Sequence, residues 1–166
     1  MPVLLVVGGD PADVATTASA LEHRFAPDYR VVTAGSAAAG HAELDRLASR
    51  GEQAALATAD LHLPDGDGVH FLSEAAARHR GLARVLLFDM DVHHTRIPFT
   101  ELPALQRASA LGQIDVWMVK GWVNPEEWLY PQVQEALCTW SKAHRPASSR
   151  ISARSRDGSS TDSARA

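Results

Sequence analysis

Three residues suited to phosphate chemistry, Asp60, Asp89 and Lys120, each directly follow a short apolar run of the chain. An aspartate can attack phosphorus and form an aspartyl phosphate. A lysine ammonium supplies a compact positive charge for the phosphoryl oxygens. Such a transfer also uses a divalent cation such as Mg²⁺, usually held by one or two further carboxylates. Asp60 therefore fits the role of phosphoacceptor, and Lys120 fits that of its charge partner.

The apolar runs predict five buried strands, separated by segments whose apolar residues recur at helical spacing. A strand followed by a helix, five times over, is typical of a parallel sheet covered on both faces, so we expect a doubly wound α/β fold. Asp10-Pro11 and Asn124-Pro125 are N-cap signals for the first and last helices. Pro131 is expected to divide the last helix, which would restart there after a short turn. The expected strands are Val3–Val7, Tyr29–Thr33, Ala54–Ala59, Arg84–Phe88 and Asp115–Val119.

The topology of such a sheet brings the candidate residues to one edge, because ligands bind beyond the carboxyl ends of the strands. The competing interpretation of any single strand-end aspartate is a helix cap or a turn former. The convergence of two carboxylates and an amine favours the chemical interpretation. The residues that follow the first, third, fourth and fifth strands are Gly8, Gly9 and Asp10, then Asp60, Asp89 and Lys120.

Two motifs carry a resemblance to a known family. The segment Asp60–Gly68 reads D-x-x-x-P-x-x-D-G, and Val116–Lys120 forms a last strand that ends in lysine. With these motifs, residues 2–143 resemble the receiver domain of bacterial two-component response regulators. The resemblance implies a flavodoxin-like fold, phosphorylation of Asp60 by a sensor histidine kinase, and Lys120 as the residue that binds the phosphoryl group. The tryptophan-rich segment 122–140 is similar to receivers that are fused to thioredoxin-reductase-like flavoproteins.

The chain departs from the family pattern at the metal site. Gly8 and Gly9 stand where the family has its acidic pair, and Asp10 lies one position late, where it is better explained as a helix N-cap. Asp60 and Asp10 are the remaining candidates for metal contact. We therefore expect a degenerate site in which Mg²⁺ binding is weakened.

The fourth and fifth strands also depart from the pattern. Asp89 replaces an expected hydroxyl residue, Gly121 replaces a proline after Lys120, and Trp117 occupies the position of an aromatic switch residue. A carboxylate about 4 Å from the acceptor repels it by about 4 kcal/mol at an effective dielectric constant of about 20. Alternatively, Asp89 holds a cation together with Asp60, or pairs directly with Lys120.

Two functions follow from these residues. The first is an atypical receiver domain in a two-component phosphorelay, with Asp60 as acceptor. The second is a pseudo-receiver, a protein-interaction module that works without phosphorylation. A distant third is a phosphatase, because Asp89 and Asp91 form a D-x-D pair, but the further motifs of such enzymes are missing. We therefore do not expect an enzyme.

Other polar groups give weaker signals. Asp91, His93 and His94 lack a further ligand set for a metal, and His62 lies two residues after Asp60, close enough to contact a phosphoryl group or water. For all of them an exposed loop position is the favoured interpretation. Neither a P-loop nor a dinucleotide-binding glycine motif is present in the sequence.

Composition narrows the class further. The chain has 166 residues and one cysteine, so it is expected to be one domain without a disulfide, in a reducing, cytoplasmic setting. No apolar run approaches a membrane span and no signal peptide is recognisable, so we expect no membrane partner. The Ser- and Arg-rich segment 144–166 carries a net charge of +3 and is expected to be a disordered tail, which leaves −7 on the domain, residues 1–143. That acidity argues against nucleic-acid binding.

Tryptophans gather near the end of the domain, in the last strand and helix. Large aromatic residues on a surface often anchor interfaces, and the competing interpretation is core packing. Trp122 and Trp128 are the expected exposed pair, and they suggest a protein partner or a homodimer formed through this last strand and helix.

Overall fold

The computed structural model describes residues 1–89, 102–120 and 124–144. Several residues considered above lie outside this part of the chain, and so does most of the expected tail. They are Asp91, His93, His94, Gly121, Trp122 and residues 145–166; the side chain of Asp89 is not described either.

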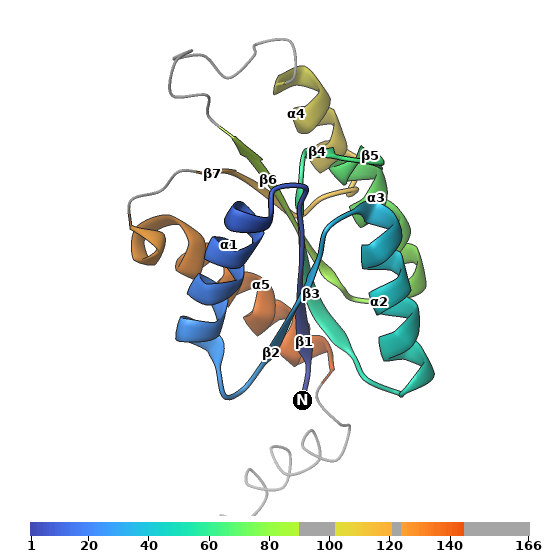
Figure 1. Cartoon of the computed structure of the whole chain (residues 1–166), viewed down its shortest axis with the longest axis vertical. Helices are drawn as coiled ribbons and strands as arrows, with labels where there is room; N and C mark the ends of the chain where they lie inside the picture. Colours follow the sequence, from blue (N-terminus) through green and yellow to red (C-terminus); the bar gives the residue numbers. More distant parts are fainter. Residues whose placement is uncertain (90–101, 121–123, 145–166) are drawn as a thin grey trace, which may run out of the picture.

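Five parallel strands form one sheet in the order β2-β1-β3-β6-β7, and helices cover both of its faces (Figure 1). This confirms the doubly wound, flavodoxin-like fold. The strands are β1 (Val3–Val7), β2 (Arg30–Ala34), β3 (Ala54–Asp60), β6 (Ala83–Asp89) and β7 (Val116–Lys120). The helices are α1 (Pro11–Phe25), α2 (Ala37–Ser49), α3 (Gly68–Arg78), α4 (Leu102–Ala110) and α5 (Pro125–Ala143). A small antiparallel pair, β4 (His62–Leu63) and β5 (Gly66–Asp67), was not expected from the sequence.

The apolar core lies in two layers, one on each face of the sheet, because successive side chains of a strand point to opposite faces. On β1, Val3, Leu5 and Val7 pack with residues of α2, α3 and α4. Leu4 and Val6 pack on the other face with residues of α1 and α5. Figure 1 shows the same division, with α1 and α5 on one side of the sheet and α2 and α3 on the other.

The helix signals read from the sequence are confirmed at both ends of the domain. Asp10 caps α1, and Asn124 caps α5. The expected break at Pro131 is wrong, because α5 runs without interruption through this residue. Pro131 removes the N–H that would bond the carbonyl of Glu127, but both residues are exposed, so water can hydrate that carbonyl.

The end of α5 packs closely on the domain. His144, which composition assigns to the tail, is the C-cap of α5, and its ring stacks on Trp140 at a centroid distance of 4.4 Å. Cys138 is exposed, with a free thiol. Within the described ranges, no helix combines the length and apolar content needed to span a bilayer.

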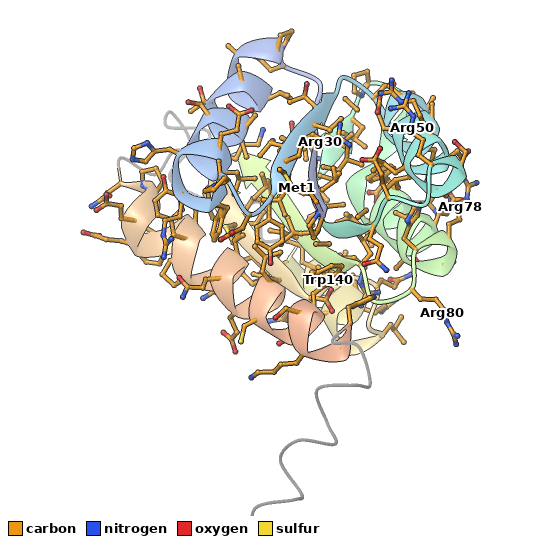
Figure 2. The ribbon with its side chains drawn as sticks, turned by 90° about the horizontal axis from the view of Figure 1, so that it is seen from below. Met1, Arg30, Arg50, Arg78, Arg80 and Trp140 are labelled. Carbon is orange, nitrogen blue, oxygen red and sulfur yellow. The ribbon has the colours of Figure 1, made fainter. Side chains whose placement is uncertain are left out.

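The amino-terminal edge of the sheet carries arginines. Seen from below in Figure 2, Met1 and Arg30 lie near the centre of this edge, and Arg50, Arg78 and Arg80 lie toward α2 and α3. Arg30 and Arg78 pair with acidic neighbours, Glu52 and Asp45. The aspartates considered for phosphate chemistry lie at the opposite edge, where the strands end.

Candidate functional site

Asp60 and Lys120 meet at the carboxyl edge of the sheet, as the topology predicts. The Nζ atom of Lys120 lies 2.8 Å from Oδ1 of Asp60, and their side chains are 8% and 12% exposed. Asp60 ends β3 and Lys120 ends β7, with β6 between them. In register, Asp60 lies beside Leu87 and Leu87 beside Met118, so the long lysine side chain reaches back across β6.

Asp13 is a further member of this site that the sequence analysis did not select. Its Oδ2 lies 3.4 Å from Nζ of Lys120, and its side chain is 48% exposed. Asp13 stands in the first turn of α1, three residues after the cap Asp10. That spacing is the sequence signal for Asp13, because helix side chains tilt toward the helix N-terminus, and the N-terminus of α1 lies at the carboxyl edge of the sheet. Lys120 therefore has carboxylates on two sides, one from β3 and one from α1.

The glycines at the end of β1 lie directly against the site. A Cβ atom at Gly8 would stand 2.5 Å from Oδ2 of Asp60 and 2.7 Å from Cγ2 of Val14. The Asp60 carboxylate therefore fills the space that a side chain at position 8 would need. A Cβ at Gly9 would lie 3.1 Å from the ring of Pro64, in the loop after β3.

Asp10 serves α1 as a cap. Its Oδ1 accepts hydrogen bonds from the backbone N–H groups of Ala12 at 2.8 Å and Asp13 at 3.2 Å. The expectation that Asp10 is an N-cap is confirmed. One of the two carboxylate oxygens of Asp10 is therefore engaged with the helix, which leaves only Oδ2 for a metal contact.

The loop after Asp60 folds back as the β4–β5 pair and leads into α3. The N–H of Gly68 donates to the carbonyl of Leu61 at 2.9 Å, and Asp67 caps α3 by accepting from the N–H of His70 at 3.0 Å. A Cβ at Gly68 would lie 2.0 Å from the carbonyl oxygen of Asp60. The final glycine of the motif is therefore needed for this close approach of two backbone segments.

Asp65, at the turn of this loop, binds the amino terminus of α2. Its carboxylate accepts from the N–H groups of Ala37 at 2.8 Å and Ala38 at 2.9 Å, while Ser36 caps the next amide, that of Ala39. The hydrogen bonds from Ala38 and then Ala37 lower the pKa of Asp65. The loop that carries Asp60 is thus fixed to a helix on the α2–α3 face.

Asp89 and Trp117 take the positions expected for them in the sheet. Asp89 is in register with Lys120 at the ends of β6 and β7. Trp117 lies on the face opposite Lys120, partly buried, with its ring 5.7 Å from that of Phe88. The aromatic position is therefore separated from the charged pair by the strand itself.

The expectations for the aromatic surface and for His62 are met in part. Trp128 is 67% exposed, as predicted, whereas Trp140 is buried in the core. Trp122 lies outside the described residues. His62 is an exposed residue of β4. In the part of the chain that the structure describes, no three His, Cys, Asp or Glu side chains are arranged to hold a metal ion.

The fold is that of response-regulator receiver domains, to judge from solved structures of similar shape. A CheY-like receiver domain protein from Methanospirillum hungatei JF-1 superimposes with a TM-score of 0.65 at 24% identity, over 86% of this chain and 98% of that one. The signal receiver domain of an HD domain-containing protein from Pseudomonas fluorescens Pf-5 gives 0.63 at 25% identity, over 87% and 93%. Response regulator TrrA from Thermotoga maritima, solved with Mg²⁺ and BeF, gives 0.54 at 19% identity, over 82% and 99%.

Similar shape also extends to a protein described as an adenylate cyclase, from Rhodopirellula baltica, with a TM-score of 0.66 at 13% identity over 92% of this chain and 97% of that one. No protein-family model matches the sequence, and no curated protein is similar enough to count as a match. The comparisons therefore establish the fold.

Proposed function

We propose that the chain is a receiver-type signalling domain, which takes up a signal at the Asp60–Lys120 pair and passes it on by binding another protein. The observation that carries this proposal is the 2.8 Å contact between Lys120 Nζ and Asp60 Oδ1 at the carboxyl edge of the sheet. The acceptor-type loop from Asp60 to Gly68 and the receiver fold of the solved structures support it. Its setting would be two-component signalling, with a sensor histidine kinase as the donor.

In this proposal Asp60 accepts a phosphoryl group. A carboxylate oxygen of Asp60 attacks phosphorus of a phosphohistidine on the partner, the new O–P bond forms, and the N–P bond breaks as the imidazole leaves with the bonding electron pair. Lys120 is already in contact with the attacking carboxylate and supplies positive charge for the phosphoryl oxygens. The chain is a substrate of this transfer, and we propose no catalytic turnover of its own.

Phosphoryl transfer is tested by incubating the full chain with acetyl phosphate, with and without Mg²⁺, and measuring its intact mass. We expect a gain of one phosphate that disappears in Asp60→Asn. The matched control is Asp45→Asn, an exposed aspartate of α2 that keeps the gain. A wild-type chain that gains no phosphate, or an Asp60→Asn chain that still gains one, contradicts Asp60 as acceptor.

A second candidate is a pseudo-receiver that binds its partner without phosphorylation. Gly8, Gly9 and the capping role of Asp10 favour it, because they leave the edge without the acidic pair of the family pattern. In that case acetyl phosphate adds no mass and the partner binds wild type and Asp60→Asn equally. The two candidates therefore differ in one pair of measurements.

The surface for a protein partner is proposed on the side of α5, where Trp128 is 67% exposed. Exposed aromatic side chains of this size are frequent anchors of interfaces. A second copy of the chain is one such partner, which would give a homodimer through the last strand and helix. We propose protein rather than nucleic acid because the domain is acidic.

A further inference from the structure

We infer that the acidic edge of this domain takes no divalent cation, and that the ammonium of Lys120, held between Asp60 and Asp13, supplies the positive charge there instead. Asp13 is then a positioning residue, which fixes the lysine from the side of α1. This inference deepens the proposed function and rests on the same edge, but it holds whether or not Asp60 accepts a phosphoryl group.

The oxygen donors at this edge do not suit Mg²⁺. The ion requires close to octahedral coordination by oxygen, usually with one or two carboxylates and several waters. Gly8 and Gly9 contribute no side-chain oxygen, and Asp10 gives its Oδ1 to two backbone amides of α1. Among the side chains that the structure describes at this edge, which do not include that of Asp89, Asp60 and Asp13 remain, and both of their carboxylates contact Lys120.

Lys120 lies where its ammonium neutralises the charge of the Asp60 and Asp13 carboxylates. Its side chain is only 8% exposed, and a buried ammonium is tolerated when carboxylates surround it. Contacts at 2.8 Å and 3.4 Å come from two different elements, β3 and α1, so movement of either one alone leaves the other contact in place. A dication bound to the same carboxylates would face the ammonium at short range.

Gly8 leaves room for the Asp60 carboxylate in the orientation in which it contacts Lys120. The Oδ2 atom of Asp60 lies 2.5 Å from the point where a Cβ at position 8 would be. An acidic residue at that position would therefore displace the carboxylate that now binds Lys120. The contact between Asp60 and Lys120 therefore depends on the absence of a side chain at position 8.

Mn²⁺ binding, followed by the electron paramagnetic resonance signal of the free ion with Mg²⁺ as competitor, tests the inference on the full chain. We expect no saturable binding by wild type at millimolar ion. We expect Lys120→Met, which frees both carboxylates, to bind the ion saturably, about tenfold or more below the millimolar concentrations at which wild type shows no binding. Lys142→Met, an exposed lysine of α5, is the matched control and should show no gain.

Saturable binding by wild type that is lost in Asp60→Asn, in Asp13→Asn or in Asp89→Asn overturns the inference. The same holds if folded Lys120→Met binds no more metal than wild type. If Lys120→Met does not fold, the wild-type titration and the role of Asp13 decide. None of these results changes whether acetyl phosphate labels Asp60, so failure here is distinct from failure of the proposed function.

The role of Asp13 is read from the side-chain ammonium of Lys120 by proton–nitrogen correlation spectra. We expect the Lys120 signal to shift or broaden in Asp13→Asn and to return toward its wild-type position in Asp13→Glu, which restores the charge. Asp45→Asn should leave that signal unchanged. A Lys120 signal that is identical in wild type and Asp13→Asn excludes Asp13 as the positioning residue.

Discussion

Removing the two ends of the Asp60–Lys120 pair should have unequal effects on stability. At 2.8 Å and an effective dielectric constant of about 20, the attraction between the two charges is about 6 kcal/mol before desolvation is subtracted. Both side chains are nearly buried, at 12% and 8% exposure, so solvent screening is small. Breaking such a pair from one side costs about 3–5 kcal/mol, because a buried charge loses its partner.

We expect the loss of stability to be larger when Lys120 is replaced than when Asp60 is replaced. Lys120→Met removes the ammonium that contacts the carboxylate of Asp60, a residue only 9% exposed, so we expect a loss of about 3–5 kcal/mol. Asp60→Asn keeps an oxygen that can accept from Lys120, and the ammonium retains Asp13 at 3.4 Å. We therefore expect only about 1–2 kcal/mol for this substitution.

Urea unfolding at neutral pH measures both losses, and thermal unfolding should give parallel shifts of about 2–4 °C for each kcal/mol. The double variant should lose less than the sum of the two single losses, because the substitutions act on one contact. Lys142→Met serves as a surface control, with an expected change within about 0.5 kcal/mol. If Asp60→Asn is as destabilising as Lys120→Met, the assignment of Lys120 as the necessary counter-ion is wrong.

Three further outcomes are expected. Gly68→Ala should destabilise by about 1–3 kcal/mol or more, because its Cβ would lie 2.0 Å from the Asp60 carbonyl oxygen, whereas Gly66→Ala, with open space around it, should stay within about 0.5 kcal/mol in the same urea assay. Asp65→Ala should be less stable than wild type above the ordinary carboxyl pKa of 3.8, and this deficit should disappear as the pH falls through the lowered pKa of Asp65; a deficit that persists in strong acid contradicts the capping role. Trp128→Ser should leave the unfolding midpoint nearly unchanged but weaken binding of a partner, or dissociate a dimer in sedimentation; unchanged association argues against this surface.

The sequence predicts the strands well because each is a continuous apolar run between polar turns. The first strand is observed as Val3–Val7, as expected; β3 extends one residue beyond its expected end, and β2, β6 and β7 each differ from the expected bounds by one residue at both ends. The β4–β5 pair could not be predicted, since two-residue strands are too short to show a periodic pattern. Likewise, continuity through Pro131 depends on solvent exposure of one carbonyl, which the sequence does not reveal.

The parts of the candidate site that depend on strand topology can be predicted from the sequence. The contacts that depend on the reach of individual side chains cannot. Convergence of Asp60 and Lys120 follows from the parallel order of the strands alone. The role of Asp13 is not predictable from the sequence, because the helix dipole already explains an acid in the first turn of a helix without any contact outside that helix. The link from Asp65 to α2 joins residues 27 and 28 positions apart in the chain, and no local pattern reports it.

The edge position of β7 has a mechanical consequence. Its described residues have a ladder neighbour on one side only, β6, so this strand can twist or tilt with less resistance than the strands inside the sheet. Lys120 and Trp117 are an odd number of positions apart and face opposite layers. A rotation of β7 that displaces the Lys120 ammonium would therefore displace the Trp117 indole in the opposite direction. A protein bound to Trp117 would then respond to changes at the carboxylates near Lys120 without contacting those carboxylates.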